Sequence, residues 1–138
     1  MKVKDVMTRE PATLAPDRTC ADAARLMRQE DCGSIPIADN GRLLGIITDR
    51  DIVVRCVAAA KDPRTMSVRE VMTADPVTVP QDEDVKTAEQ IMADQQIRRL
   101  PVVDDGRLIG IVVIGQLARQ ERDGGRIGET LKDISAQA

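Results

Sequence analysis

The sequence predicts a mixed α/β protein of the α+β kind, built from two pseudo-symmetric copies of one αβαββα unit. Val3–Val53 aligns with Val68–Ala118 without a gap: VKDVMT returns as VREVMT, and IPIADNGRLLGI returns as LPVVDDGRLIGI. Each copy holds a stretch with apolar residues at helical spacing, then two short apolar segments around an Asp-x-Gly turn. We expect the copies to pack face to face, because a unit of about 60 residues rarely makes a sufficient core alone.

Each copy is predicted to start with a short amphipathic segment and a brief alternating segment, and then to form its long helix. In the first copy these are Val3–Met7, Ala12–Leu14 and Thr19–Glu30; in the second they are Val68–Met72, Val77–Val79 and Asp84–Gln95. The helices are predicted because apolar residues recur in them at helical spacing. Thr19 and Asp22 also have the spacing of a capping box, which is typical of a helix start.

Two strands and a closing helix complete each copy. The strands are expected over Ser34–Ala38 and Leu43–Thr48, and over Leu100–Val103 and Leu108–Val113; the closing helices run from Asp49 to about Ala60 and from Gly115 to about Arg122. Asn-Gly and Asp-Gly turns join the strands of each pair, because their backbones tolerate positive φ. We therefore divide the chain into a first domain at 1–60, a linker at 61–67, a second domain at 68–122 and a tail at 123–138.

The composition excludes several classes of function. The chain has no His, which removes Ser-His-Asp and Cys-His catalytic arrangements and His metal ligands. It has no Phe, Tyr or Trp, so it offers no aromatic platform for single-stranded nucleic acid, and its net charge of -3 argues against a general polyanion binder. We expect no catalytic site, no metal site and no nucleic-acid partner.

The cysteines and the apolar runs bear on the cellular compartment. Cys20, Cys32 and Cys56 are odd in number and lack C-x-x-C spacing, which favours free thiols in a reducing cytosol over a zinc or disulfide framework. The first residues, MKVKDVMTREP, lack the apolar run of a signal peptide. Runs such as Ile109–Ile114 are too short to span a bilayer. We expect a cytoplasmic protein without a membrane partner.

The repeated motifs resemble those of a pair of cystathionine β-synthase (CBS) domains. The resemblance rests on VMT near each start, the strands IPI and LPV, the D-x-G-R-L-h-G-I hairpins and the TDRDI segment, and it covers 3–122. It implies a non-catalytic module that requires no cofactor and binds an adenosyl ligand in a cleft between the copies. That ligand would be AMP, ADP or ATP, or alternatively S-adenosylmethionine or NAD. The resemblance also implies a homodimer.

Thr48 and Asp51 are the first candidates for contact with such a ligand. Their spacing is that of a capping box, in which both side chains simply satisfy free N–H groups at a helix start. A carboxylate also suits the two ribose hydroxyls, because it offers two acceptor oxygens and no competing donor. Since T-x-x-D is the ribose-binding position of the family that the chain resembles, we assign Thr48 and Asp51 to the ribose.

Further candidates follow from the resemblance and from charge. The resemblance places three residues around the base: Ile46, Pro76 and Val77. Arg98 and Arg99 stand where the first copy has Gly33 and Ser34. Guanidinium groups match phosphate oxygens, although paired basic residues are also common on a solvated strand edge. Strand alternation turns one of the two away, and we choose Arg98 for the phosphates, with Arg50 as a third candidate.

The second copy departs from the ribose-binding pattern. Val113 replaces the threonine and Gln116 replaces the aspartate. Val113 can accept no hydrogen bond, and Gln116 offers one carbonyl oxygen without a charge. We therefore expect one good nucleotide site per chain and one degenerate cleft.

Three functions remain open. The favoured one is a regulatory module that binds an adenine nucleotide or related adenosyl compound and signals its level through its dimer interface or to an unidentified protein target. The second is a dimerisation or interaction module that binds no nucleotide and keeps T-x-x-D as a helix cap. The third, an enzyme acting on the nucleotide, is disfavoured because the sequence has no visible general base or metal cluster.

Overall fold

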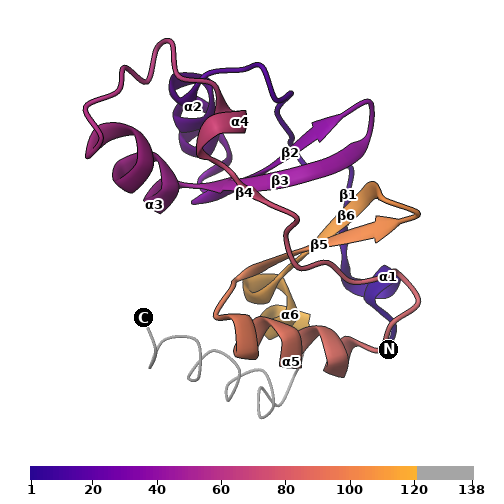
Figure 1. Ribbon diagram of the computed structural model, residues 1–138. Coiled ribbons are helices and arrows are strands. Elements are labelled where there is room, and N and C mark those ends of the chain that lie inside the picture. Colours follow the sequence, from indigo (N-terminus) through magenta and orange to yellow (C-terminus); the bar gives the residue numbers. More distant parts are fainter. Residues whose placement is uncertain (121–138) are drawn as a thin grey trace. The chain divides into compact units, whose positions relative to one another are not determined.

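The computed structural model describes residues 1–120, which form two compact units (Figure 1). The first unit comprises Ala12–Pro76, and the second comprises Met1–Pro11 together with the chain from Val77 onward. The opening segment of each sequence repeat therefore belongs to the unit formed by the rest of the other repeat. The tail predicted at 123–138 and the end of the last predicted helix lie outside the described residues.

The first unit is a short antiparallel sheet with helices packed on one face. Its elements are α2 (Cys20–Glu30), β2 (Ser34–Asp39), β3 (Arg42–Thr48), α3 (Asp49–Asp51), the π-helix η1 (Ile52–Val57), α4 (Val68–Val71) and β4 (Thr73–Ala74). Strand β3 lies between β2 and β4 and pairs antiparallel with both. The buried core comes from every helix except α3, and from β2 and β3: Cys20, Ala23, Met27, Ile35, Ile37, Ile47, Cys56, Val68 and Val71.

The second unit repeats this plan with segments from both ends of the described chain. Its elements are α1 (Val3–Val6), β1 (Thr8–Arg9), α5 (Val85–Gln95), β5 (Arg99–Asp104), β6 (Arg107–Val113) and α6 (Ile114–Gln120). Strand β6 pairs antiparallel with β5 and with β1. Its core is again aliphatic: Val3, Val6, Val79, Val85, Ala88, Met92, Leu100, Val102, Val112, Ile114 and Leu117.

Each hairpin turns through two residues with positive φ. Asn40 and Gly41 have φ of 50° and 85°, and Asp105 and Gly106 have φ of 50° and 79°. A type I′ turn requires positive φ at both central residues, and its twist matches that of the flanking strands. The predicted Asn-Gly and Asp-Gly hairpins are therefore confirmed.

A glycine in each hairpin makes room for the opening segment of the other repeat. A Cβ atom on Gly45 would lie 2.6 Å from Met72 Sδ, and one on Gly110 would lie 2.7 Å from Met7 Sδ. Strands β4 and β1, which follow these methionines, pair with the glycine-bearing strands. The repeated VMT motif thus fixes where each opening segment packs.

The mixed α/β class, the long helices and the hairpins are confirmed, and several details differ from the prediction. The alternating segments predicted at Ala12–Leu14 and Val77–Val79 form only isolated bridges, of Leu14 with Ile37 and of Val79 with Val102. The first closing helix changes to π-helix after α3 and ends at Val57. Ala60 then has φ of 59°, a left-handed conformation that stops a helix. The last closing helix begins at Ile114 instead of Gly115. The two-residue strands β1 and β4 were not predicted, because their neighbours are supplied by distant segments.

Candidate functional site

Thr48 and Asp51 form the predicted capping box at the end of β3. Ile47 is fully buried, so Ile46 and Thr48 on either side of it face away from the core of the first unit. Thr48 Oγ1 accepts a hydrogen bond from Asp51 N at 3.0 Å, and Asp51 Oδ2 accepts one from Thr48 N at 3.0 Å. These two bonds satisfy free N–H groups at the start of α3.

The same capping box at the start of α2 provides a reference within the first unit. Asp22 accepts from Thr19 N through Oδ2 at 3.1 Å, and Arg18 Nε lies 3.1 Å from the same oxygen. Its second oxygen, Oδ1, accepts from Arg25 Nη2 at 2.6 Å. Both oxygens of Asp22 are therefore occupied. The hydrogen bonds from the Thr19 backbone and from Arg25 hold the pKa of Asp22 well below its usual range.

Asp51 differs from Asp22 at its second oxygen. Among the described residues no hydrogen bond reaches Asp51 Oδ1, whose nearest cationic neighbour is Arg55 Nε at 3.9 Å. The Asp51 side chain is only 13% exposed. A half-buried carboxylate oxygen with no donor at hydrogen-bond distance can accept from a ligand hydroxyl, while the Thr48 hydroxyl keeps its own proton to donate.

Arg55 connects Asp51 to the opening segment of the second repeat. Its Nη1 donates to the carbonyl oxygens of Val71 at 3.0 Å and Met72 at 3.2 Å, at the end of α4. Residue Met72 in turn packs against Gly45 of β3. The Arg55 guanidinium is therefore held by the end of α4, and its Nε lies 3.9 Å from Asp51 Oδ1.

The matching position in the second unit is engaged differently. Gln116 Oε1 accepts a hydrogen bond from Thr8 Oγ1 at 2.8 Å, in a half-buried contact. Strand β1 thus brings Thr8 beside the one carbonyl oxygen that Gln116 has to offer, and the degenerate second cleft stays a prediction. Val113, at the threonine position, is half-buried and carries no hydrogen-bonding group.

The remaining candidates divide between the two units. Arg50 is exposed and follows Asp49, whose Oδ1 accepts from Arg50 N at 2.8 Å; Pro76 is half-buried at the end of the first unit. Three candidates belong to the second unit: Val77, Arg98 and Arg99. Their participation in the Asp51 site stays a prediction.

The two arginine candidates have different surroundings. Arg98 is exposed, and its carbonyl oxygen accepts from Ile114 N at 3.0 Å. Arg99 is half-buried at the start of β5, and its Nε is buried without a hydrogen-bond partner among residues 1–120. An unsatisfied guanidinium N–H is costly, so Arg99 stands beside Arg98 as a candidate for an anionic group.

Two residues at the strand-to-helix corners, the junctions that hold Asp51 and Gln116, were not predicted from the sequence. Arg55 lies four residues after Asp51, a spacing that brings helical side chains together and that could have suggested an ion pair. Thr8 had no comparable signal, because it reaches Gln116 across 108 positions of sequence. Such a contact depends on which unit the opening segment joins.

All three thiols lie in the first unit. Cys20, Cys32 and Cys56 are free, and Cys20 and Cys56 are fully buried. Burial and the neighbouring Cys56 raise the pKa of Cys20 to about 11, so its thiol stays protonated at neutral pH.

Within residues 1–120, no group of three or more His, Cys, Asp or Glu side chains is arranged to hold a metal ion. The same residues contain no helix with the length and apolar character needed to cross a membrane.

A family profile decides the relationship that the hairpins and the T-x-x-D corner suggest. The profile of the CBS domain matches residues 3–57 and again residues 68–122. The chain belongs to the CBS domain family. This CBS pair is 43% identical over 135 residues to the CBS domain-containing protein YhcV of Bacillus subtilis (strain 168), covering 98% of this chain and 96% of that protein.

Solved CBS proteins of similar structure carry different bound groups. The structure of CBSX2 in complex with AMP matches with a TM-score of 0.75 at 27% identity, over 86% of this chain and 94% of that one. The CBS domain pair of MJ0100, in complex with 5-methylthioadenosine and S-adenosyl-L-methionine, matches with a TM-score of 0.75 at 32% identity, over 87% and 94%. Hypoxic Response Protein I, with two coordinated zinc ions, matches with a TM-score of 0.81 at 34% identity, over 88% and 99%. Adenosyl compounds recur among these neighbours.

Proposed function

We propose that this CBS pair is a non-catalytic regulatory module that binds one adenine nucleotide, AMP, ADP or ATP, with the ribose on Asp51 and Thr48. The observation that carries the proposal is the open oxygen of Asp51. Asp22, in an identical capping box, has both oxygens occupied, whereas Asp51 Oδ1 has no hydrogen-bond donor among residues 1–120. Capping alone does not require that difference. The AMP complex of CBSX2 supports the same class of ligand.

The rest of the proposed site follows the chemistry of the ligand. Arg98 and Arg99 would bind the phosphates through charge-assisted hydrogen bonds. The base would lie among aliphatic side chains, Ile46, Pro76 and Val77, because the chain has no aromatic residue. We further propose a cytoplasmic homodimer, which passes the bound state to a protein target. Ligand binding shifts the equilibrium between two conformations of the module only as far as the ligand's affinities for those conformations differ.

A thermal-melt panel with AMP, ADP, ATP, adenosine, NAD and S-adenosylmethionine tests the proposal. A ligand present at 100 times its dissociation constant adds about 2.7 kcal/mol to the free energy of unfolding. We expect such a shift with at least one adenine nucleotide, and its loss in the Asp51→Ala variant. Failure of every ligand to shift the melt would favour the interaction module that binds no nucleotide. Incubation with ATP, followed by a product assay, tests the absence of catalysis.

S-adenosylmethionine is the second candidate, because the MJ0100 pair is solved with it. It shares the adenosyl end with AMP but carries no phosphate. Both ligands therefore need Asp51 as an acceptor for the ribose, whereas only AMP needs Arg98 and Arg99 to bind a phosphate. Comparing the affinities of AMP and S-adenosylmethionine for a variant with Arg98 and Arg99 both replaced by alanine distinguishes the two candidates.

A further inference from the structure

Two of the three thiols of the first unit lie against each other in its core. Cys20 is the first residue of α2, Cys56 lies in η1, and both side chains are 0% exposed. The Cys56 thiol is the side-chain hydrogen-bond partner of the Cys20 thiol. Cys56 Sγ in turn donates to the carbonyl oxygen of Lys61 at 3.6 Å. We call Cys20 and Cys56 the thiol pair.

The linker that follows η1 is bonded to both members of the thiol pair. Lys61 N donates to the carbonyl oxygen of Cys56 at 3.0 Å, and Cys20 N donates to the carbonyl oxygen of Met66 at 2.9 Å. The stretch 61–66 therefore runs from one cysteine to the other. Backbone contacts that do not involve sulfur thus place the start of α2 beside η1.

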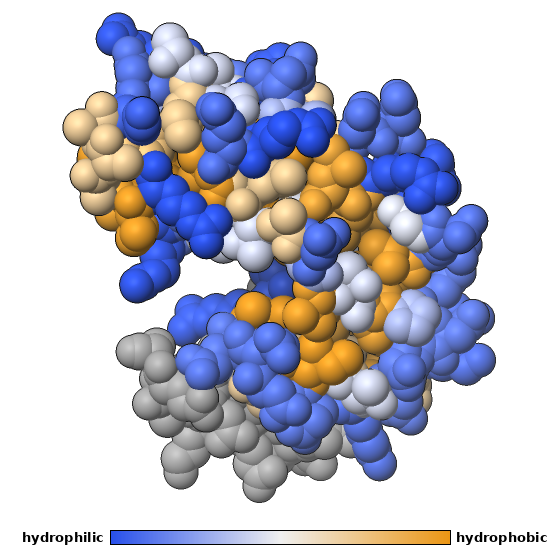
Figure 2. All heavy atoms as spheres, viewed as in Figure 1, coloured by the Kyte–Doolittle hydropathy of each residue, from blue (hydrophilic) through white to orange (hydrophobic). Residues whose placement is uncertain are grey.

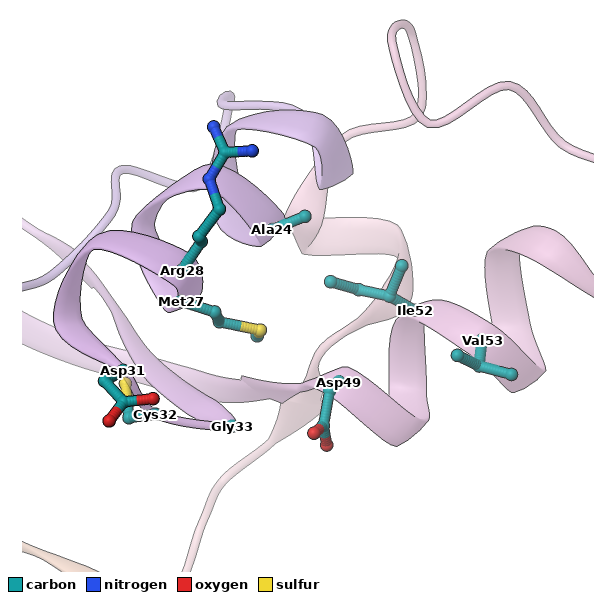
Figure 3. A pocket seen from close by; sticks show the side chains of 9 residues that line it. All are labelled: Ala24, Met27, Arg28, Asp31, Cys32, Gly33, Asp49, Ile52 and Val53. Atoms are coloured by element: carbon teal, nitrogen blue, oxygen red, sulfur yellow. The ribbon is translucent and has the colours of Figure 1, made fainter.

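Cys32 does not compete with Cys56 as a partner for Cys20. It lies just beyond the far end of α2, beside Asp31, at one end of the cavity shown in Figure 3. The 11 residues of α2 separate it from Cys20 by roughly 16 Å, at about 1.5 Å per residue. A disulfide needs Cα atoms roughly 4.4–6.8 Å apart. Cys20 therefore has one thiol within bonding reach, that of Cys56.

Packing alone does not require sulfur at the start of α2. The residue of the second repeat that matches Cys20 is Val85, which is 4% exposed in the core of the second unit. Val85 N donates to the carbonyl oxygen of Met1, as Cys20 N donates to that of the matching Met66. An aliphatic side chain thus fills the same place in the same fold. Two contacting thiols add a reaction that valine lacks, the formation of a disulfide.

The linker beside the thiol pair is itself exposed. Residues 58–62 are exposed, and Figure 2 shows mainly hydrophilic and weakly polar side chains where the chain passes from η1 to α4. A turn holds this segment: Met66 N donates to the carbonyl oxygen of Asp62 at 2.9 Å, and Arg64 N donates to Asp62 Oδ1 at 2.9 Å. Exposed segments of this kind open locally at far lower cost than the whole fold. Such an opening admits a small oxidant to the thiol pair while the sheet stays intact.

We propose that Cys20 and Cys56 form a reversible disulfide when the chain meets a peroxide, which makes the first unit sensitive to oxidants. One thiolate attacks hydrogen peroxide, the O–O bond breaks, and a sulfenic acid and a hydroxide result. The second thiolate attacks the sulfenic sulfur and displaces another hydroxide. Both hydroxides take up the protons that the thiols released. Two thiols and one peroxide thus give one disulfide and two water molecules, and a dithiol reductant restores the thiols by exchange.

The bond would cross-link two helices that are far apart in the sequence. It joins the start of α2 to η1, and a cross-link of this kind stabilises a fold chiefly by restricting the unfolded chain. It would also hold closed the place where the linker opens. Disulfides in a reducing compartment are usually transient and respond to oxidants, which fits a pair that returns to free thiols. The inference is independent of the nucleotide and goes beyond the proposed function.

Peptide mapping of the full chain with Cys32→Ser tests the bond directly. The chain is treated with hydrogen peroxide, alkylated with iodoacetamide, denatured and digested with trypsin without reductant. We expect the peptides Thr19–Arg25 and Cys56–Lys61 to be recovered as one species that dithiothreitol splits, from a chain that stays monomer-sized on a non-reducing gel. Cys20→Val, which copies Val85, gives no such species. Oxidation to sulfinic acids alone, or links between chains alone, would overturn the proposal.

Melting and oxidation kinetics test the place of the bond. The oxidised chain should melt about 5 °C or more above the reduced chain, and Cys20→Val should lose that difference. An oxidised chain that melts no higher than the reduced chain carries no bond between these two helices, which overturns the inference. Asp62→Ala removes the side-chain bonds of the exposed turn and should speed disulfide formation several-fold. Asp94→Ala, on the exposed side of α5, is the matched control and should leave the rate unchanged.

Discussion

The corners at Asp51 and Gln116 occupy matching positions of the two repeats and use their side chains in opposite ways. The amide oxygen of Gln116 accepts a hydrogen bond from Thr8 of β1. This bond links the opening segment of the first repeat directly to the residue at the matching position. Asp51 makes no such bond to β4. Arg55 fastens the equivalent segment instead, through the carbonyl oxygens of Val71 and Met72. One corner is closed by protein contacts, and the other keeps a carboxylate oxygen open.

This difference shows how a repeat can hold its fold while its sites diverge. Both units need the opening segment fastened beside the glycine-bearing strand, because Met7 and Met72 pack there. A neutral hydrogen bond does this in one unit. In the first unit the Arg55 guanidinium holds the segment, and Asp51 Oδ1 beside it is left without a hydrogen-bond donor in residues 1–120, so it can accept from a ligand. The following tests act on that contrast, from the largest expected effect to the smallest.

Replacing Asp51 with alanine is expected to give the largest effect. The change removes the open acceptor, and a ribose diol left partly unsatisfied on burial costs on the order of 1–3 kcal/mol. Isothermal titration should show adenosyl-ligand affinity at least tenfold weaker, for phosphorylated and uncharged ligands alike. The apo protein loses only a helix cap, about 0.5–2 kcal/mol.

Asp22→Ala is the matched control for this change. It removes an identical capping box whose carboxylate is already saturated, so it lowers stability without changing ligand affinity. Equal affinity losses in the two variants would mean that both act through folding and that Asp51 is no more than a cap.

Arg98→Ala combined with Arg99→Ala should weaken phosphorylated ligands about tenfold or more and adenosine hardly at all. Each charge-assisted contact is worth roughly 1.5–3 kcal/mol, and its effect should fade as salt rises. The first repeat has Gly33 and Ser34 at these positions, so the variant makes the second repeat more like the first. Titrations with AMP and adenosine at two salt concentrations measure the ratio. An unchanged AMP-to-adenosine ratio identifies the pair as a solvated edge and favours S-adenosylmethionine.

Local elements were predictable because their signals are local. The capping boxes at Thr19 and Thr48 follow from residues three apart, and the hairpins follow from Asn-Gly and Asp-Gly turns. Repeat self-similarity predicted that both units share one plan. Even the asymmetry between Asp51 and Gln116 was visible in the sequence.

Distant contacts were not predictable in the same way. Nothing in VMT itself indicates that Thr8 joins the unit of the second repeat. Each repeat has an equivalent glycine-bearing strand, so the opening segment could pair with the strand of either repeat. The roles of Thr8 and Arg55 depend on that choice. The π-helix also has no periodicity distinct from that of an α-helix over six residues.

Arg55→Met tests whether the cation supports the open corner. Methionine keeps the length and helix propensity of the side chain but removes its donors to Val71 and Met72 and its charge beside Asp51. We expect a loss of a few fold in nucleotide affinity and faster amide hydrogen exchange in β4. Arg25→Met, which removes the cation beside Asp22, is the control and should leave both readings unchanged. Equal exchange rates in β4 for Arg55→Met and wild type would show that this arginine does not fasten the segment.

The smallest effect is expected at the closed corner. Thr8→Val and Gln116→Leu remove one half-buried neutral hydrogen bond, and a bond of that kind contributes about 0.5–1.5 kcal/mol to stability. Changing both partners together leaves no unsatisfied donor or acceptor, so the double variant should be more stable than either single variant. Denaturant unfolding measures that coupling. Calorimetry should still give one adenosyl ligand per chain with unchanged affinity, because Val113 has no acceptor for the ribose and the Gln116 carbonyl oxygen already accepts a hydrogen bond from Thr8. A drop in stoichiometry from two ligands to one in Gln116→Leu would show instead that this corner binds ligand, and that the contrast with Asp51 is one of degree.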